Sequence, residues 1–250
     1  MSPEEIQQTI TLIEETCTKY GIDDAYFVGG YPRTIIMGLP LTDVHDLDVA
    51  SGKPGRARSL GGFVAEEGKA DDINYHHRTS ALTVSLGDVE VDFQGSEMHE
   101  EVMPYVRMAG VAENPIALNI FDRDFTMNSL AIHVGTNRIL DITKRGITDI
   151  HNKNVVSIIP AEIKVKKDPL MITRAIRMAV KYNFTINDAL WKAMKRYSGL
   201  LNKKLTPQRL AIEAYILNKY PASKEFINRL GIEYLSAPEL VELGTEEAEA

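Results

Sequence analysis

The sequence predicts an α+β protein, in which residues 1–159 form a small mixed sheet with flanking helices and residues 160–250 form an all-helical domain. Short apolar segments bounded by glycine-containing turns recur as far as Ile159, a spacing typical of strands. Beyond Pro160 the apolar residues recur at helical spacing over segments of ten or more residues. The chain contains no internal repeat and no low-complexity linker, so we interpret the boundary as a change of architecture.

The composition is that of a globular chain with a buried core, because 44% of its 250 residues are hydrophobic and 25% are charged. No run of about 18 apolar residues is present, and the acidic N-terminus lacks the basic and apolar pattern of a signal peptide. The single cysteine, Cys17, excludes an internal disulfide and a cysteine-rich zinc site. We therefore expect a cytoplasmic protein that does not span a membrane.

The first helix is predicted to begin at Pro3, because Ser2 and Glu5 fit the N-cap and N3 positions of a capping box. Isoleucines then recur at helical spacing on one face, which predicts an amphipathic helix packed on the core. Gly21 is predicted to end this helix.

The strand pattern begins at residues 25–28, which run into a Gly-Gly pair and a helix predicted over 33–37. A second strand is predicted over 46–50. Residues 81–86 and 89–93 alternate across a Gly-Asp turn, which predicts a hairpin.

A second hairpin is predicted to join residues 130–134 with residues 138–141. Three long helices are predicted beyond it, over 169–182, 187–197 and 207–218. The first and third of these follow an Asp-Pro and a Thr-Pro pair, which fit the N-cap and N1 positions.

Two aspartates, Asp46 and Asp48, stand two residues apart in the second predicted strand. Their side chains then share one face, with Cα atoms about 7 Å apart. Carboxylates so placed repel unless a cation lies between them, and Mg²⁺ favours carboxylate and phosphate oxygens. Asp92, on the strand face opposite to Val91 and Phe93, is a candidate third ligand. The alternatives are a chance Asp-x-Asp pattern and, for Asp92, a solvent-facing edge residue.

The Gly29-Gly30 pair lies between a predicted strand and a predicted helix. Glycines there allow backbone N–H groups and the positive end of the helix to approach an anion closely. Arg33 lies one turn into the helix. The arrangement predicts a phosphate-binding turn, and the alternative is an ordinary tight turn.

Five motifs, in order along the chain, resemble those of the class II tRNA nucleotidyltransferase (CCA-adding enzyme) and bacterial poly(A) polymerase family. They are Phe27 to Arg33 with Asp46-Leu47-Asp48, Arg123 to Ser129, Asp141 with Gly146 and Asp149, Lys167 to Arg177, and Pro207 to Glu213. The resemblance implies a polymerase-beta-type nucleotidyltransferase head over residues 1–159 and a helical neck over residues 160–250. It also implies two Mg²⁺ ions, with Mn²⁺ as a substitute, at the carboxylates.

The same resemblance implies nucleotide contacts in both predicted domains. The residues implied to hold the triphosphate are Gly29, Gly30 and Arg33; those implied to line the sugar and phosphates are Arg123, Asp124 and Asn128; those implied to lie near the base and triphosphate are Asp168, Met171, Arg174 and Arg177; and those implied to brace the neck are Arg209 and Glu213.

Four positions depart from the family pattern. Met171 stands where the family has a base-selecting arginine, and a thioether cannot present the paired donors of a guanidinium. Lys167 replaces the preceding glutamate, and Thr34 replaces an aspartate. Asp122 replaces the first arginine of the doubled pair in the second motif, which removes one cation. Because Asp46 and Asp48 are retained, we expect the chemistry to be retained and the nucleotide preference to differ.

The charge is segregated along the chain. The formal net charge is -7, yet residues 164–209 contain twelve Lys and Arg against two Asp. This basic segment predicts a contact with an RNA backbone, and the alternative is a solvated helix face.

The leading hypothesis is a template-independent nucleotidyltransferase that adds NMP from CTP or ATP to an RNA 3′ end, in tRNA CCA addition or repair. One alternative keeps the same site and transfers the nucleotide to a protein or small molecule. Another is a degenerate module that binds nucleotide or RNA without catalysis.

Overall fold

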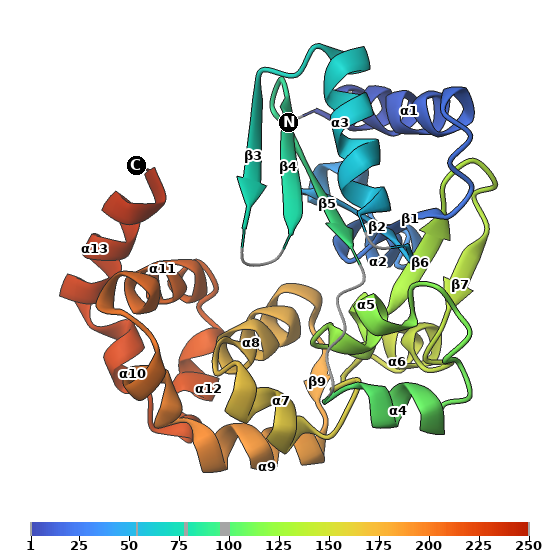
Figure 1. Cartoon of the computed structure of the whole chain (residues 1–250). Coiled ribbons are helices and arrows are strands. Elements are labelled where there is room, and N and C mark those ends of the chain that lie inside the picture. The colour runs from blue at the N-terminus through green and yellow to red at the C-terminus, as the bar shows by residue number, and fades with distance from the viewer. Residues whose placement is uncertain (1, 54, 78–79, 96–100, 250) are drawn as a thin grey trace. The chain divides into compact units, whose positions relative to one another are not determined.

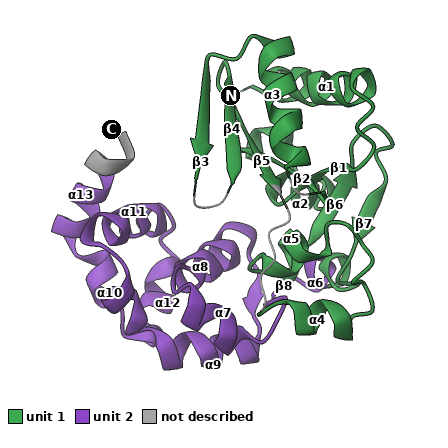
Figure 2. Ribbon diagram, viewed as in Figure 1, with its two compact units in different colours: residues 1–148 green, residues 149–250 purple. Residues whose placement is uncertain are grey.

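The computed structural model describes residues 2–53, 55–77, 80–95 and 101–249 (Figure 1). The chain forms two compact units, Met1–Thr148 and Asp149–Ala250 (Figure 2). The units divide ahead of residue 160, where the sequence predicts the change of architecture. The reason is a short parallel pairing between strands β8 (Asn154–Val155) and β9 (Thr185–Ile186), which ties β8 to the second unit.

The first unit is built on a seven-stranded sheet with the order β3-β4-β5-β2-β1-β6-β7. Its strands are β1 (Ala25–Val28), β2 (Leu47–Ser51), β3 (Asp72–His76), β4 (Ala81–Leu86), β5 (Val89–Gly95), β6 (Leu130–His133) and β7 (Ile139–Asp141). The β2–β5 pair is parallel and the other pairs are antiparallel, so the predicted mixed sheet is confirmed. Both predicted hairpins, β4–β5 and β6–β7, are present.

Helices α1 (Pro3–Lys19) and α3 (Arg56–Gly68) pack on each other and on the sheet (Figure 1). The predicted capping box of α1 is confirmed, because the Ser2 backbone N–H donates to Glu5 Oε2 at 2.6 Å and the Glu5 N–H donates to Ser2 Oγ at 3.2 Å. Gly61 of α3 allows a close approach, since a Cβ there would lie 2.7 Å from the Phe93 ring. The face of β5 that carries Phe93 is therefore the covered face, and the alternate residue Asp92 lies on the other.

Several predicted boundaries in the first unit are wrong. Helix α2 (Gly30–Ile36) begins three residues before the predicted Arg33, because Gly29, at φ 75°, turns the chain directly into the helix. Strand β2 begins at Leu47, so Asp46 precedes it. Short strands were expected to dominate this region, and α3 was not predicted. Nor were the short helices α4 (Met103–Met108), α5 (Ala117–Asp122) and α6 (Gly146–His151), or the 3₁₀ turns η1 (Leu41–Asp43) and η2 (Thr126–Asn128).

The second unit is helical apart from the β8–β9 pairing, which corrects the all-helical prediction. Its helices are α7 (Ala161–Lys167), α8 (Leu170–Tyr182), α9 (Asp188–Tyr197), α10 (Leu200–Lys204), α11 (Pro207–Asn218), α12 (Ser223–Leu230), η3 (Glu233–Ser236) and α13 (Pro238–Glu249). The three predicted long helices correspond to α8, α9 and α11, and Thr206 caps α11 as predicted. Asp168 does not directly precede α8, although its Oδ1 accepts from the Leu170 N–H at 3.1 Å. Among the described residues, no helix has the length and apolar character needed to cross a membrane.

Candidate active site

Asp48 and Asp92 lie side by side on the sheet. They are direct partners in the parallel pairing of β2 with β5, where neighbouring strands are about 4.8 Å apart. Directly paired residues point to the same face, so both carboxylates emerge on the face that α3 does not cover. Two of the three predicted metal-binding carboxylates are thus neighbours through sheet register.

Asp48 is held by two side chains from other elements. Arg123 Nη1 donates to Asp48 Oδ2 at 3.2 Å, and Gln94 Nε2 donates to Asp48 Oδ1 at 3.0 Å. The side chains of Arg123 and Asp48 are 15% and 17% exposed, so this ion pair is largely shielded from water. Burial raises the pKa of Asp48, the Arg123 guanidinium opposes that shift, and the nearby carboxylates of Asp46 and Asp92 add to it.

Asp46 lies at the entrance to the same site, although it is outside the strand. Its side chain is exposed, and its Oδ1 would be 3.8 Å from a Cβ placed on Gly30. Its charge raises the pKa of Asp48, so the two carboxylates are close enough to interact. The structure brings Asp46, Asp48 and Asp92 together around the end of β2.

The predicted glycine turn lies directly against this carboxylate group. Gly29 has φ 75° and ψ -123°, a conformation that strongly favours glycine. A Cβ at Gly29 would lie 2.3 Å from Asp48 Oδ2 and 2.7 Å from Arg123 Nη1. The absence of a side chain at this position is therefore what allows the Asp48–Arg123 pair to approach the backbone.

Arg33, Asn128 and Asp124 form a hydrogen-bonded chain that links α2 to the segment around η2. Arg33 Nη1 donates to Asn128 Oδ1, and Asn128 Nδ2 donates to Asp124 Oδ1 at 2.8 Å. Asp124 Oδ1 also accepts from the Phe125 N–H at 2.7 Å. Arg33 is only 9% exposed, so the chain holds its guanidinium in place beside the glycine turn.

Four further residues at the site were not predicted. Gln94 contacts Asp48, and Asn119 Oδ1 accepts from Arg123 Nε at 3.2 Å. Thr83 donates to Asp92 Oδ1, and His76 Nε2 lies 2.9 Å from Thr83 Oγ. The predicted hairpin turn already pairs residue 83 with residue 92, so strand register is the signal that would have identified Thr83.

The donor set fits a magnesium site in chemistry. Carboxylate oxygens are the hard ligands that Mg²⁺ prefers, and the burial of Asp48 beside two other carboxylates favours a bound cation. Among the described residues, however, no three carboxylate, imidazole or thiolate groups converge on one point. Arg123 and Gln94 engage Asp48, and Thr83 engages Asp92.

In the second unit, two of the residues implied to lie near the base form an ion pair, with Arg174 Nη2 2.9 Å from Asp168 Oδ2. Arg177 on α8 is half-buried. Met171 is only 2% exposed, so its thioether packs in the interior of the unit. Of the four implied residues, Met171 alone is fully buried.

Glu213 forms the centre of a buried contact between α8 and α11. Thr173 Oγ donates to Glu213 Oε2 at 2.5 Å, and Arg209 Nη2 donates to Glu213 Oε1 at 2.8 Å. The Glu213 side chain is 2% exposed, whereas the Arg209 side chain is 43% exposed. The predicted i, i+4 pair is therefore present, and Glu213 also reaches the neighbouring helix.

The basic segment folds into a cationic cluster around Tyr197, which we call the Tyr197 cluster and define as Lys166, Arg196 and Lys204. Lys166 Nζ and the Arg196 guanidinium lie 5.0 Å and 5.5 Å from the centre of the Tyr197 ring. Lys204 Nζ donates to the Lys166 carbonyl at 2.5 Å. All three cations are exposed, whereas Lys164 of the same segment is 6% exposed.

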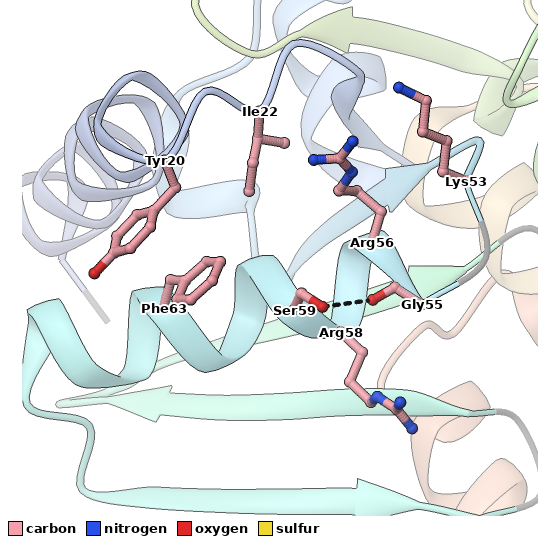
Figure 3. A pocket seen from close by; sticks show the side chains of 8 residues that line it. All are labelled: Tyr20, Ile22, Lys53, Gly55, Arg56, Arg58, Ser59 and Phe63. Carbon is pink, nitrogen blue, oxygen red and sulfur yellow. Dashed lines mark hydrogen bonds between the residues drawn. The ribbon is translucent and has the colours of Figure 1, made fainter.

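An open groove of about 620 Å³ lies elsewhere on the first unit, between the end of α1 and the first half of α3 (Figure 3). The rings of Tyr20 and Phe63 stack at 3.9 Å along one wall. Its cations Lys53 and Arg56 lie 3.9 Å and 3.7 Å from the Asp24 carboxylate. None of the predicted site residues lines this groove, so it is separate from the carboxylate site.

The chain is similar to known proteins. The family model described as the poly A polymerase head domain matches residues 25–156. A tRNA nucleotidyltransferase from Schizosaccharomyces pombe is 28% identical over 228 residues, which cover 83% of this chain and 46% of that protein. A CCA-adding enzyme from Streptococcus uberis is 29% identical over 213 residues, which cover 84% of this chain and 49% of that protein.

The fold also matches solved structures. The Thermotoga maritima CCA-adding enzyme complexed with tRNA-CCA aligns with a TM-score of 0.73 at 18% sequence identity. The alignment covers 94% of this chain and 53% of that chain. The chain therefore spans about half the length of the curated relatives that it matches.

Proposed function

Because this chain belongs to the poly A polymerase head domain family, we propose that it is a metal-dependent, template-independent nucleotidyltransferase. The proposed reaction transfers NMP from CTP or ATP to the 3′ end of an RNA, in tRNA CCA addition or repair. The observation that carries the proposal is the pairing of Asp48 with Asp92 directly against the Gly29 turn. The curated relatives, a tRNA nucleotidyltransferase and a CCA-adding enzyme, support the choice of acceptor.

In the proposed reaction, the RNA 3′-hydroxyl oxygen bonds to the α-phosphorus of the NTP, the bond to pyrophosphate breaks, and the hydroxyl loses its proton. Such phosphoryl transfer needs positioning and charge neutralisation, so it requires no nucleophilic side chain. Asp46, Asp48 and Asp92 are the residues that would hold two Mg²⁺ ions, or Mn²⁺ in their place. Bound there, the ions would lower the pKa of the hydroxyl and stabilise the leaving pyrophosphate.

The triphosphate is assigned to the turn at Gly29 and Gly30 and to the cations beside it. The glycine turn lies directly against Asp48 and Arg123, and Arg33 is held next to it through Asn128. Arg123 lies between Asp48 and Asn119, so Asn119 can fix Nε while the other guanidinium nitrogens neutralise a phosphate.

The contact with RNA is assigned to the basic segment 164–209 and centred on the Tyr197 cluster. Its cations are exposed, and they come from three different helices, α7, α9 and α10. Lysine and arginine side chains bind phosphates without regard to base sequence, and an aromatic ring among them can stack on an unpaired base. Asp168, Arg174 and Arg177 remain assigned to the base and triphosphate of the incoming nucleotide.

The test is a matrix in which each of the four α-labelled NTPs is offered with Mg²⁺ to tRNA that lacks CCA, to tRNA that ends in CC, and to unrelated RNA. We expect labelled tRNA from CTP or ATP. The variant with Asp46→Ala and Asp48→Ala should be inactive, whereas Asp72→Asn, an exposed strand carboxylate of the same sheet, should match the wild type. No labelled RNA from any NTP, or full activity without both aspartates, would refute the proposal.

A rival acceptor is a protein or small molecule served by the same site. Met171 occupies the position of the family's base-selecting arginine and is buried, and this observation supports the rival. Mass analysis of a cell lysate labelled with each NTP separates the two, because the rival predicts labelled protein or metabolite and unlabelled RNA.

A further inference from the structure

We propose that Thr83 and His76 are positioning residues that fix the carboxylate of Asp92 for metal binding. The inference rests on the proposed function, because it assigns these residues to the same carboxylate site. Thr83 is half-buried in β4 and His76 is exposed at the end of β3. Neither residue belongs to the motifs that the sequence analysis identified.

The register of the sheet places these side chains in one row. Thr83 is the direct partner of Asp92 in the β4–β5 hairpin, and Asp92 is the direct partner of Asp48 in the β5–β2 pair. His76 lies on the same face, two residues beyond Asn74, which is the direct partner of Thr83. A continuous polar row therefore crosses four adjacent strands and ends at the buried carboxylate of Asp48.

The chemistry of the row fixes the direction of its hydrogen bonds. A threonine hydroxyl has one hydrogen, and Thr83 Oγ donates it to Asp92 Oδ1. His76 Nε2, which lies 2.9 Å from Thr83 Oγ, must then be the donor to that oxygen. The imidazole thus carries a proton on Nε2, and this donation polarises the threonine hydroxyl toward Asp92.

The consequence for Asp92 is a carboxylate held in one orientation. Its Oδ1 is engaged by Thr83, and the described part of the structure gives its Oδ2 no hydrogen bond. Rotation about the last side-chain torsion would exchange the two oxygens, and the Thr83 contact opposes that rotation. Hydrogen bonds to a ligating carboxylate commonly change metal affinity or activity 10–100-fold when they are removed, so the row is expected to tune metal affinity.

The experiment measures Mn²⁺ binding directly, by the electron paramagnetic resonance signal of free Mn²⁺, in the whole protein without nucleotide. Thr83→Val removes the hydroxyl and keeps the shape, and Thr83→Ser restores a donor. Ser85→Ala is the matched control, because Ser85 lies on the same face of the same strand and pairs with Glu90. For the histidine, His76→Ala is compared with His77→Ala, since His77 packs on the Tyr75 ring.

We expect Thr83→Val to weaken Mn²⁺ binding about 10-fold, with Thr83→Ser close to the wild type and Ser85→Ala unchanged. His76→Ala should weaken binding about fivefold, the effect of roughly one hydrogen bond, and His77→Ala should not. In nucleotide transfer, the Mn²⁺ or Mg²⁺ concentration for half-maximal rate should rise in the same order while the rate at saturating metal changes less. Melting temperatures without metal identify any variant that fails to fold.

The two proposals fail in different ways. If the wild type binds Mn²⁺ and transfers nucleotide, but Thr83→Val equals the wild type in both measurements, the positioning role is wrong and the proposed function stands. If Thr83→Ser is as weak as Thr83→Val, the hydroxyl is not the cause and the positioning role is also wrong. If the wild type neither binds Mn²⁺ nor transfers nucleotide, the proposed function itself is wrong.

Discussion

Asp48 illustrates how a single side chain sets the electrostatic character of the site. It is shielded from water by β1, β5 and Arg123, and two other carboxylates are close to it. The ion pair with Arg123 compensates only part of this unfavourable environment, because burial and the neighbouring charges raise the pKa of Asp48 overall. A carboxylate in such a place is better suited to binding a cation than to stabilising the fold.

Asp48→Asn should therefore stabilise the metal-free protein at neutral pH, because asparagine removes a charge that the folded state disfavours. A carboxyl whose pKa is raised on folding stabilises the fold below its ordinary pKa, 3.8, and loses that contribution as pH rises through the raised value. The advantage of the variant should thus grow as pH is raised from about 4 toward 7. Thermal melting in EDTA measures it, and Asp72→Asn controls for the loss of one surface charge. A variant less stable than the wild type across this range would contradict the assignment.

Among single residues, the sequence named Asp48, Asp92 and Arg123 as candidates, and it missed the partners Gln94 and Thr83. Asp48 and Asp92 are recognisable because side chains alternate between the two faces of a strand. Gly29 is recognisable because it lies in a turn between a strand and a helix. The contact of Arg123 with Asp48 joins residues 75 positions apart, so it depends on tertiary packing that no local pattern encodes. The burial of Met171 was likewise outside the reach of a motif comparison, because it follows from how α8 packs.

At the scale of elements, the turn between β1 and α2 combines a conformational and a steric requirement. Its positive φ favours glycine, and the contact with Asp48 leaves no space for a methyl group. The turn therefore couples the start of α2 to the position of the buried carboxylate.

Gly29→Ala should reduce nucleotide transfer by about 100-fold, because a displacement of Asp48 or Arg123 by about 1 Å costs that much in a positioned site. Gly21→Ala is the matched control, since Gly21 also has a positive φ, 63°, but a Cβ there meets no atom within 4 Å. The control should lose stability from backbone strain and keep its activity. Equal loss of activity in both variants would show that strain alone, and not crowding at Asp48, is responsible.

In the second unit, the buried contact between Thr173 and Glu213 joins α8 to α11. Glu213→Ala would remove the hydrogen bond between Thr173 and a carboxylate, although the Leu170 carbonyl at 3.0 Å remains as an acceptor, and it would leave the space of a buried side chain empty. We expect a cost of about 2 kcal/mol in the free energy of unfolding. Arg209→Ala should cost a comparable amount, because it leaves the Glu213 carboxylate, which is 2% exposed, without its cation. Urea denaturation of both variants measures the two costs. If Arg209→Ala left the stability unchanged, the ion pair would not contribute to bracing the helices.

Elements with their own termination signals were predictable, and those stabilised by packing were not. The capping box of α1, the two hairpins and the Thr206 cap of α11 are local signals, and all are confirmed. Helix α3 lacks a side-chain cap and contains adjacent glycines, Gly61 and Gly62, which are poor helix formers. Gly61 fits closely against Phe93 and Leu82, a contact that is visible only in the folded unit.

At the scale of the whole molecule, charge is divided between an acidic chain and one basic segment. Converting Lys166, Arg196 and Lys204 of the Tyr197 cluster to alanine should weaken tRNA binding and reduce the dependence of log K on log salt by about 2 to 3, because each phosphate contact contributes about 0.7 to 0.9. Fluorescence anisotropy at several salt concentrations measures the slope. A variant with Lys224→Ala, an exposed lysine on α12 outside the basic segment, is the single-site control. An unchanged slope in the triple variant would place the RNA contact elsewhere.

The order of the strands was also beyond local sequence reasoning. Strand β2 pairs in parallel with β5, although α3 and two further strands separate them in the chain. Hairpin patterns predict only neighbours joined by a turn, so this long-range pairing, which brings Asp48 beside Asp92, was not predicted. The α+β class follows from the change from strand spacing to helical spacing along the chain. The assembly of the site follows from the long-range pairing of β2 with β5.

Single-turnover transfer of labelled CMP or AMP to tRNA that lacks CCA tests whether Asp48 and Asp92, beside the Gly29 turn, form a site of nucleotide transfer. It compares the wild type with Asp48→Asn and Asp92→Asn at saturating Mg²⁺, after melting curves have shown that each variant is folded. We expect transfer by the wild type and a loss of at least about 1000-fold in Asp48→Asn, equivalent to about 4 kcal/mol of barrier. A folded Asp48→Asn that transfers nucleotide at the wild-type rate would contradict this expectation.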